Sequence, residues 1–347
     1  MKDRNLAIDY IRVLACLLVI VIHSPMAGIG TSSFIMASCS LIGMPCVCLF
    51  FMVSGYLLLP TKESMFSFLH KRMNRILWPT LFWTVFYLLV AYFSTGNYAG
   101  QPWLKTILSI PFTRQGNGFL WFMYTLVGLY LLAPILSAWL STATKKEVQL
   151  ILALWGVSLL YPLLKQVLYL TEDTYGILYY FTGYAGYFLL GYYIKCYRPG
   201  ISFVLLAFLY LVPMLVALLG RVNKMDLLTD SFSYLSIWAG MMSFALFMLF
   251  VKLFPSTTAS RLRPADTSML TRLIVCLSKC SFGIYLVHKL VLKDCLFHVG
   301  FISRYGGIAQ ILMTIPLTLF ISWAVVWLLS FLPFADYIVG FSSRKGE

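Results

Sequence analysis

The sequence predicts an all-α protein that crosses a membrane about ten times. Of its 347 residues, 61% are hydrophobic and only 11% are charged, and the mean hydropathy is +0.86. A soluble domain carries about 25% charged residues, so the composition excludes a soluble globular protein. The apolar runs are long and lack the strict alternation of β-barrel strands, which favours a polytopic helical bundle.

The apolar runs divide into ten candidate spans, each long enough to cross a bilayer as a helix. In chain order they are 6–26, 34–59, 76–94, 119–140, 148–170, 177–197, 201–220, 234–254, 273–298 and 308–333. Lys and Arg concentrate in every second connection, beginning with the one after the second span. The positive-inside rule then places both termini in the cytoplasm. Because no repeat or low-complexity segment interrupts the chain, residues 1–347 are expected to form a single membrane domain.

The net charge of +14 does not indicate a nucleic-acid-binding protein. The basic residues cluster at the ends of spans, where membrane topology requires them. The lipid bilayer is therefore the expected partner, and no nucleic acid is expected.

The eight cysteines also have a structural interpretation. Most lie within apolar runs, and no His/Cys pair with the spacing of a zinc site lies near them. We expect small core residues and no metal site.

The first span carries three ionisable residues, Asp9, Arg12 and His23. A charge inside a bilayer costs a few kcal/mol, so such residues usually face the protein interior. Arg12 and His23 are eleven residues apart, which places them about 16 Å apart along one helical face. They could form part of a site, or they could merely reach the interface and bond to a neighbouring helix.

Two further groups lie on the expected cytoplasmic side. Ser54 and Tyr56 flank Gly55, a pattern that suits either close helix packing or a hydroxyl-lined site. Arg72 and Arg75 are three residues apart at the entry to the third span, on one helical face. Such a pair can clamp a phosphate, because guanidinium groups bind phosphate oxygens bidentately. The same pair could also serve only as a topology signal.

Aromatic residues and a second histidine lie on the expected outer side. Trp121 opens the fourth span, where it could belong to an aromatic belt or stack on a sugar ring. Tyr285 and His288 are three residues apart on one face of the ninth span. His288 and His23 could therefore lie at similar depth, and paired intramembrane imidazoles favour a proton-handling site.

Five motifs occur in one order along nearly the whole chain: the Arg12-to-His23 spacing, FFMVSGYLL at 50–58, RMNR at 72–75, LWF at 120–122 and SFGIYLVH at 281–288. In these motifs the chain resembles the acyltransferase 3 family of integral membrane O-acyltransferases. The resemblance implies a stand-alone enzyme of the bacterial cytoplasmic membrane. Its expected co-substrate is cytoplasmic acetyl-CoA, and no tightly bound cofactor is expected. The acceptor would be a hydroxyl of a cell-surface glycan or a lipid-linked sugar precursor.

The resemblance also suggests roles for individual residues. His23 corresponds to the essential histidine, which would act as a base or carry the acyl group, and Arg12 corresponds to its partner. The residues assigned to acyl-CoA are Arg72, Arg75, Ser54 and Tyr56.

The residues assigned to the acceptor or to proton transfer are Trp121, Tyr285 and His288. Two other classes also fit the composition: a transporter or flippase of a lipid-linked or small polar substrate, and a membrane sensor or scaffold. Within the enzyme class, a succinyl or longer acyl donor is a variant that no residue excludes.

Overall fold

The computed structural model describes residues 5–25, 32–95, 120–170, 176–255, 268–296 and 307–344. All regular structure in these ranges is helical, which confirms the all-α prediction. The α-helices are α1 (Leu6–His23), α2 (Ser33–Gly43), α3 (Cys46–Leu58), α4 (Met65–Thr95), α6 (Trp121–Leu140), α7 (Lys145–Ser158), α8 (Tyr161–Val167), α9 (Ala185–Tyr197), α10 (Phe203–Val222), α11 (Asp226–Thr229), α12 (Ile237–Leu253), α14 (Met269–Leu290), α16 (Gly307–Leu329) and α17 (Ala335–Ile338). A π-helical turn, Val291–Leu296, extends α14.

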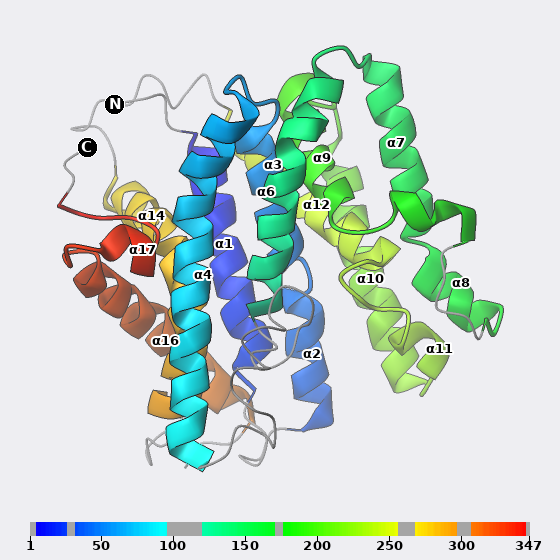
Figure 1. Ribbon diagram of the computed structural model, residues 1–347. Helices are drawn as coiled ribbons and strands as arrows, with labels where there is room; N and C mark the ends of the chain where they lie inside the picture. Colours follow the sequence, from blue (N-terminus) through cyan, green and yellow to red (C-terminus); the bar gives the residue numbers. More distant parts are fainter. Residues whose placement is uncertain are drawn as a thin grey trace.

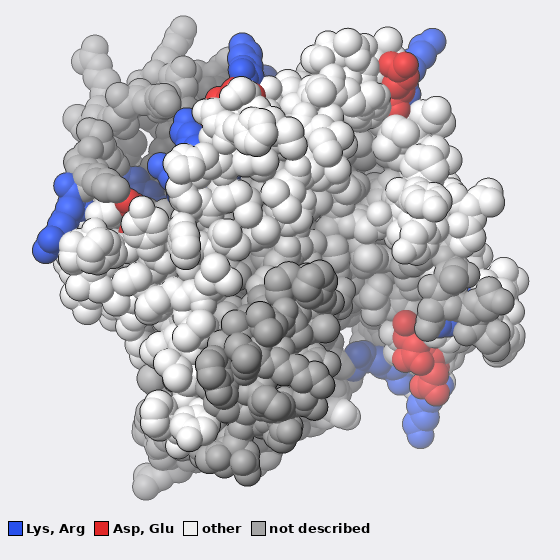
Figure 2. Space-filling model, viewed as in Figure 1, with Lys and Arg blue, Asp and Glu red and all other residues white. Residues whose placement is uncertain are grey.

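Seven helical segments of the described chain are long and apolar enough to cross a membrane, and Ile237–Leu253 is a shorter apolar helix. Figure 2 shows the matching surface, in which charged side chains gather near the two ends of the molecule and uncharged residues fill the band between them. The chain is therefore a multi-pass membrane protein. The count of ten spans and the cytoplasmic termini stay predictions.

Several predicted spans are not single straight helices. The segment predicted as 34–59 is divided between α2 and α3 at Pro45, which has no N–H for a helical hydrogen bond. The segment predicted as 177–197 contains a 3₁₀ turn, Gly176–Phe181, and α9 begins only at Ala185. Gly183 separates the two because its φ of +97° is incompatible with a helix.

Helix α1 lies in the middle of the bundle (Figure 1) and packs against α2, α3, α12, α14 and α16. More than half of its side chains are buried, and Asp9 is only 4% exposed. The ionisable residues of the first span therefore face protein rather than lipid, as the cost of exposing charge to lipid requires.

Glycines permit the close crossing of α3 with α9. A Cβ added to Gly55 would overlap the carbonyl oxygen of Phe188, and one added to Gly191 would overlap that of Met52. The two glycines thus let the backbones of α3 and α9 touch, as small residues do between membrane helices. Gly55 is therefore a packing residue. The hydroxyl groups of Ser54 and Tyr56, on either side of it, point away from this contact.

Candidate functional site

A cavity of about 300 Å³ lies between α1, α3, α4, α6 and α14. We call it the basic cavity, because its charged lining residues are Arg12 from α1, Arg72 and Arg75 from α4, and Lys279 from α14. Arg72 and Arg75 share a face because the helix of the third span begins at Met65, earlier than predicted. None of the described residues that line it is acidic.

The charge balance of the basic cavity favours an anionic ligand. The Nε atom of Arg72 is buried and has no hydrogen-bond partner among the described residues. Burying a charged donor without a partner is costly, so an acceptor from a ligand would stabilise this arrangement. Ser54 and Tyr130 add hydroxyl groups to the wall. The cavity can therefore bind phosphate oxygens through several charge-assisted hydrogen bonds.

A second cavity, of about 180 Å³, lies around the C-terminal end of α1. We call it the histidine cavity; its polar and aromatic lining residues are His23, Trp121, Tyr234, Tyr285 and Lys289. Trp121 packs against Tyr234 with ring centroids 5.5 Å apart. The aromatic wall beside an imidazole suits a ligand that has both a flat apolar face and a hydroxyl group.

The imidazole of His288 lies behind that of His23. Their ring centroids are 5.4 Å apart, which confirms that the two histidines lie at similar depth. Nδ1 of His288 lies 2.6 Å from the carbonyl oxygen of Tyr285. Because a carbonyl oxygen can only accept, Nδ1 must carry the proton in this hydrogen bond. His288 is 1% exposed and does not line the histidine cavity, so it is placed to orient His23 rather than to touch a ligand.

Tyr285 connects the two cavities, because it lines both of them. Its ring is held against Phe122, another wall residue of the basic cavity, with centroids 5.1 Å apart. Arg12 faces the basic cavity and His23 faces the histidine cavity, about 16 Å apart along α1. A ligand with a long thin arm could therefore be held by cations at one end and meet an imidazole at the other.

Helices α1 and α14 are fixed to each other at three levels. The Ser278 hydroxyl donates to Oδ1 of Asp9 at 2.6 Å, and the Cys16 thiol donates to the carbonyl oxygen of Ser281 at 3.2 Å. The contact between the two histidines is the third level. The residue numbers rise together along both helices, so α1 and α14 run parallel, as expected of the first and ninth of ten alternating spans.

The structure brings most of the predicted site residues together but separates one. Tyr56 does not join Ser54 at the basic cavity. It lines another cavity, with Arg198 and Lys252, and its hydroxyl accepts a hydrogen bond from Nδ2 of Asn5 at 3.1 Å. Two residues apart on a helix, Ser54 and Tyr56 point about 200° away from each other. Tyr56 therefore lies at a different cavity from Arg72 and Arg75.

Among the polar lining residues that sequence reasoning missed are Lys279, Lys289 and Tyr234. Lys279 and Lys289 lie within the predicted ninth span, and a lysine in an apolar run is itself a signal of an interior site. Tyr234, at the start of the predicted eighth span, carried no comparable signal. No group of three or more His, Cys, Asp or Glu that could hold a metal occurs within the described part of the chain.

The fold and the two cavities define a multi-pass membrane protein with a cation-lined site joined to an intramembrane histidine site. The family described as "Acyltransferase domain" matches residues 5–327. The match covers nearly the whole chain, so the protein belongs to this family, the acyltransferase 3 family. No curated protein matches the chain, and no solved structure matches it.

Proposed function

We propose that this acyltransferase transfers an acetyl group from cytoplasmic acetyl-CoA to a hydroxyl group on the other side of the membrane. The acceptor would be a cell-surface glycan or a lipid-linked sugar precursor. The bacterial cytoplasmic membrane would hold the enzyme, with both chain ends in the cytoplasm. The observation that carries the proposal is that the basic cavity and the histidine cavity share Tyr285.

The basic cavity would bind the phosphate groups of coenzyme A. Arg72 and Arg75 present two guanidinium groups from one face of α4, and Arg12 and Lys279 add charge from two other helices. The buried Nε of Arg72 would gain a phosphate oxygen as its acceptor. Held in this way, the pantetheine arm would pass Tyr285 and bring the thioester to His23.

His23 would act as the general base for the transfer. It would take the proton of the acceptor hydroxyl as the hydroxyl oxygen attacks the thioester carbon. The C–O bond forms, the C–S bond breaks, and the departing thiolate receives the proton from His23. In the variant with an acyl carrier, the His23 nitrogen would first take the acetyl group as the C–S bond breaks and the CoA thiolate leaves. The acceptor oxygen would then take the acetyl group as the C–N bond breaks, and the hydroxyl proton would pass through the freed imidazole to the thiolate.

The residues around His23 would support these steps. His288 would pack behind the His23 ring and hold its orientation, with its own Nδ1 bonded to the carbonyl oxygen of Tyr285. The ring of Trp121 would stack on a sugar, and its partners Tyr184 and Tyr234 hold it at centroid distances of 5.3 and 5.5 Å. Lys289, at the same cavity, would stabilise the oxyanion that develops on the thioester.

The test is transfer of radiolabelled acetyl from acetyl-CoA in membranes that contain the protein. His23→Ala should abolish transfer while membrane insertion and folding are retained. His70→Ala is the matched control, since His70 lies on the exposed part of α4 near Asn74, outside both cavities. Wild-type protein that transports a substrate but transfers no acyl group would overturn the proposal in favour of a transporter or flippase. An active His23→Ala variant would remove His23 from the mechanism.

A further inference from the structure

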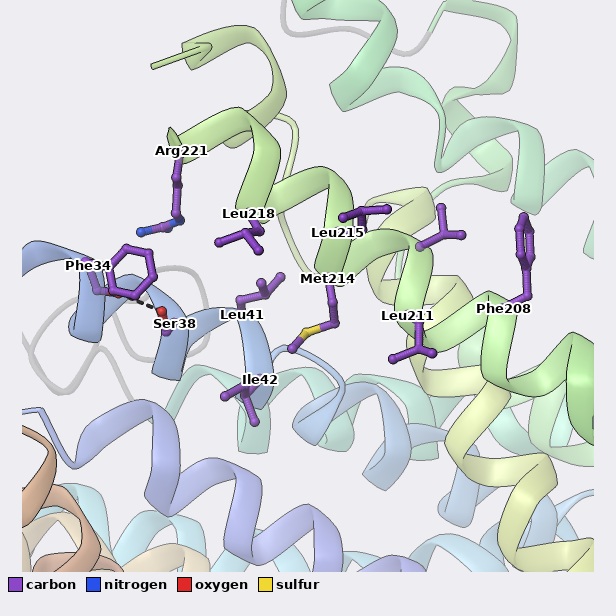
Figure 3. A pocket seen from close by; sticks show the side chains of 11 residues that line it. Phe34, Ser38, Leu41, Ile42, Phe208, Leu211, Met214, Leu215, Leu218 and Arg221 are labelled. Carbon is purple, nitrogen blue, oxygen red and sulfur yellow. Dashed lines mark hydrogen bonds between the residues drawn. The ribbon is translucent and has the colours of Figure 1, made fainter. Parts of the chain in front are cut away.

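A third cavity, distinct from the site described above, lies between α2 and α10. This groove has a volume of about 570 Å³, within the range of about 300 to 1,000 Å³ typical of ligand pockets. Phe34, Ser38, Leu41 and Ile42 form the α2 wall, and residues from Phe208 to Arg221 form the α10 wall (Figure 3). All but two of the lining side chains are apolar.

The apolar walls and the length of the groove suit the acyl chain of a lipid. Its walls expose large apolar side chains: Phe34 is 53% exposed, Leu211 60% and Leu215 54%. From Phe208 to Arg221 the α10 wall is about 20 Å long. One leaflet of a bilayer has a hydrocarbon depth of about 15 Å, half of the core thickness, so the groove spans one leaflet and reaches its headgroup region.

The charged side chain at the end of the groove is complementary in charge to a phosphate. Arg221 is the one charged residue among the described lining residues. It lies in the last turn of α10 (Figure 3), where its side chain reaches toward Phe34 of α2. Lys224, Asp226 and Asp230 follow in the chain but do not line the groove. The Ser38 hydroxyl already donates to the carbonyl oxygen of Phe34 at 2.7 Å. The described residues of the groove therefore offer one cation at the surface and, below it, only a hydroxyl that is already bonded within α2.

We propose that this groove is a binding site for one anionic phospholipid, with an acyl chain between α2 and α10 and its phosphate on Arg221. The occupant is a phospholipid rather than a sugar-bearing lipid, because a sugar headgroup needs several polar partners and the lining residues supply only Arg221 and Ser38. The site does not depend on acyl transfer.

The bound lipid would support the helix that holds the histidine cavity. The other face of α2 packs on α1, where a Cβ added to Gly43 would overlap the side chain of Ile22. Ile22 lines the histidine cavity beside His23. One side of α2 would thus rest on the lipid, and the other would rest on the helix that carries the proposed base.

Binding is measured by native mass spectrometry of the detergent-purified protein titrated with phosphatidylglycerol. We expect one lipid that survives delipidation in the wild type. Arg221→Gln should weaken binding about fivefold, the worth of one cation near a lipid phosphate, and Arg221→Lys should restore most of it. Leu215→Trp, which fills the groove, should abolish retention of the lipid.

Two control variants separate the groove from the general surface. Lys224→Gln removes a charge at the same end of α10, and Leu219→Trp adds the same bulk to an α10 residue that does not line the groove. Both should retain wild-type binding. Arg221→Gln and Leu215→Trp proteins that bind phosphatidylglycerol like the wild type would overturn the proposal. Tighter binding of a polyprenyl-phosphate sugar at this groove would also overturn it, because the groove would then hold the acceptor.

Discussion

Arg72 offers the most direct test of the basic cavity. Its Nε atom is buried with no partner among the described residues, and its guanidinium faces a cavity that it shares with Arg12, Arg75 and Lys279. In Arg72→Gln the phosphate would lose charge-assisted hydrogen bonds, worth about 1.5 to 3 kcal/mol. This corresponds to a loss of affinity for acetyl-CoA of about 10- to 150-fold. The three remaining cations should place the effect near the lower end of this range.

The measurement is equilibrium binding of acetyl-CoA to purified protein, followed by kinetics in reconstituted membranes. We expect KM for acetyl-CoA to rise about tenfold with a nearly unchanged kcat, because the phosphates lie far from the reacting bond. Lys71→Gln is the matched control: it removes the same charge one residue away, from a side chain that is 54% exposed and bonded to Glu63 at 2.8 Å. Equal losses in both variants would show a general electrostatic effect. Unchanged affinity in Arg72→Gln would refute phosphate binding in this cavity.

Three further variants test other parts of the structure. Gly55→Ala should lower the melting temperature by several degrees, because its Cβ would displace the α9 backbone at a cost of about 1 to 3 kcal/mol. Gly128→Ala, where a Cβ meets no atom within 4 Å, should leave the melting temperature unchanged. His288→Gln should lower kcat at least tenfold while acetyl-CoA affinity is retained, since His288 contacts His23 but not the basic cavity; equal losses of both would indicate misfolding. Trp121→Ala should raise KM for the acceptor and leave KM for acetyl-CoA unchanged, as substrate-dependence curves for the two substrates would show.

Much of the fold and part of the site follow from sequence patterns of known physical origin. The apolar runs predict helices because a bilayer leaves backbone groups no other partner. The eleven-residue spacing of Arg12 and His23 predicts a shared helical face, and the structure places both residues on cavities joined by Tyr285. Arg72 and Arg75 share a cavity because residues three apart lie on one face of a helix.

Tyr56 shows a separation that the helical period itself produces. The hydroxyls of Ser54 and Tyr56 look equivalent in the sequence, but residues two apart on a helix differ by about 200° in direction, so Ser54 lines the basic cavity and Tyr56 lines another cavity. The role of Tyr234 depends on which distant helices meet, and local pattern carries no information about that. The sequence does not predict the groove between α2 and α10 either, because the residues of its walls resemble ordinary lipid-facing residues.

The α1–α14 pair explains how one site can extend over such a distance. The Asp9–Ser278 bond lies beside the basic cavity, which Ser278 lines, and the contact of His23 with His288 lies beside the histidine cavity. The Cys16–Ser281 bond fixes the register between them. A shift of either helix by one residue would separate all three pairs and displace the two cavities together. Helix α1 itself fixes the separation of Arg12 and His23, which a carrier arm of fixed length requires. The parallel pair holds Lys279 and Tyr285 of α14 in register with them.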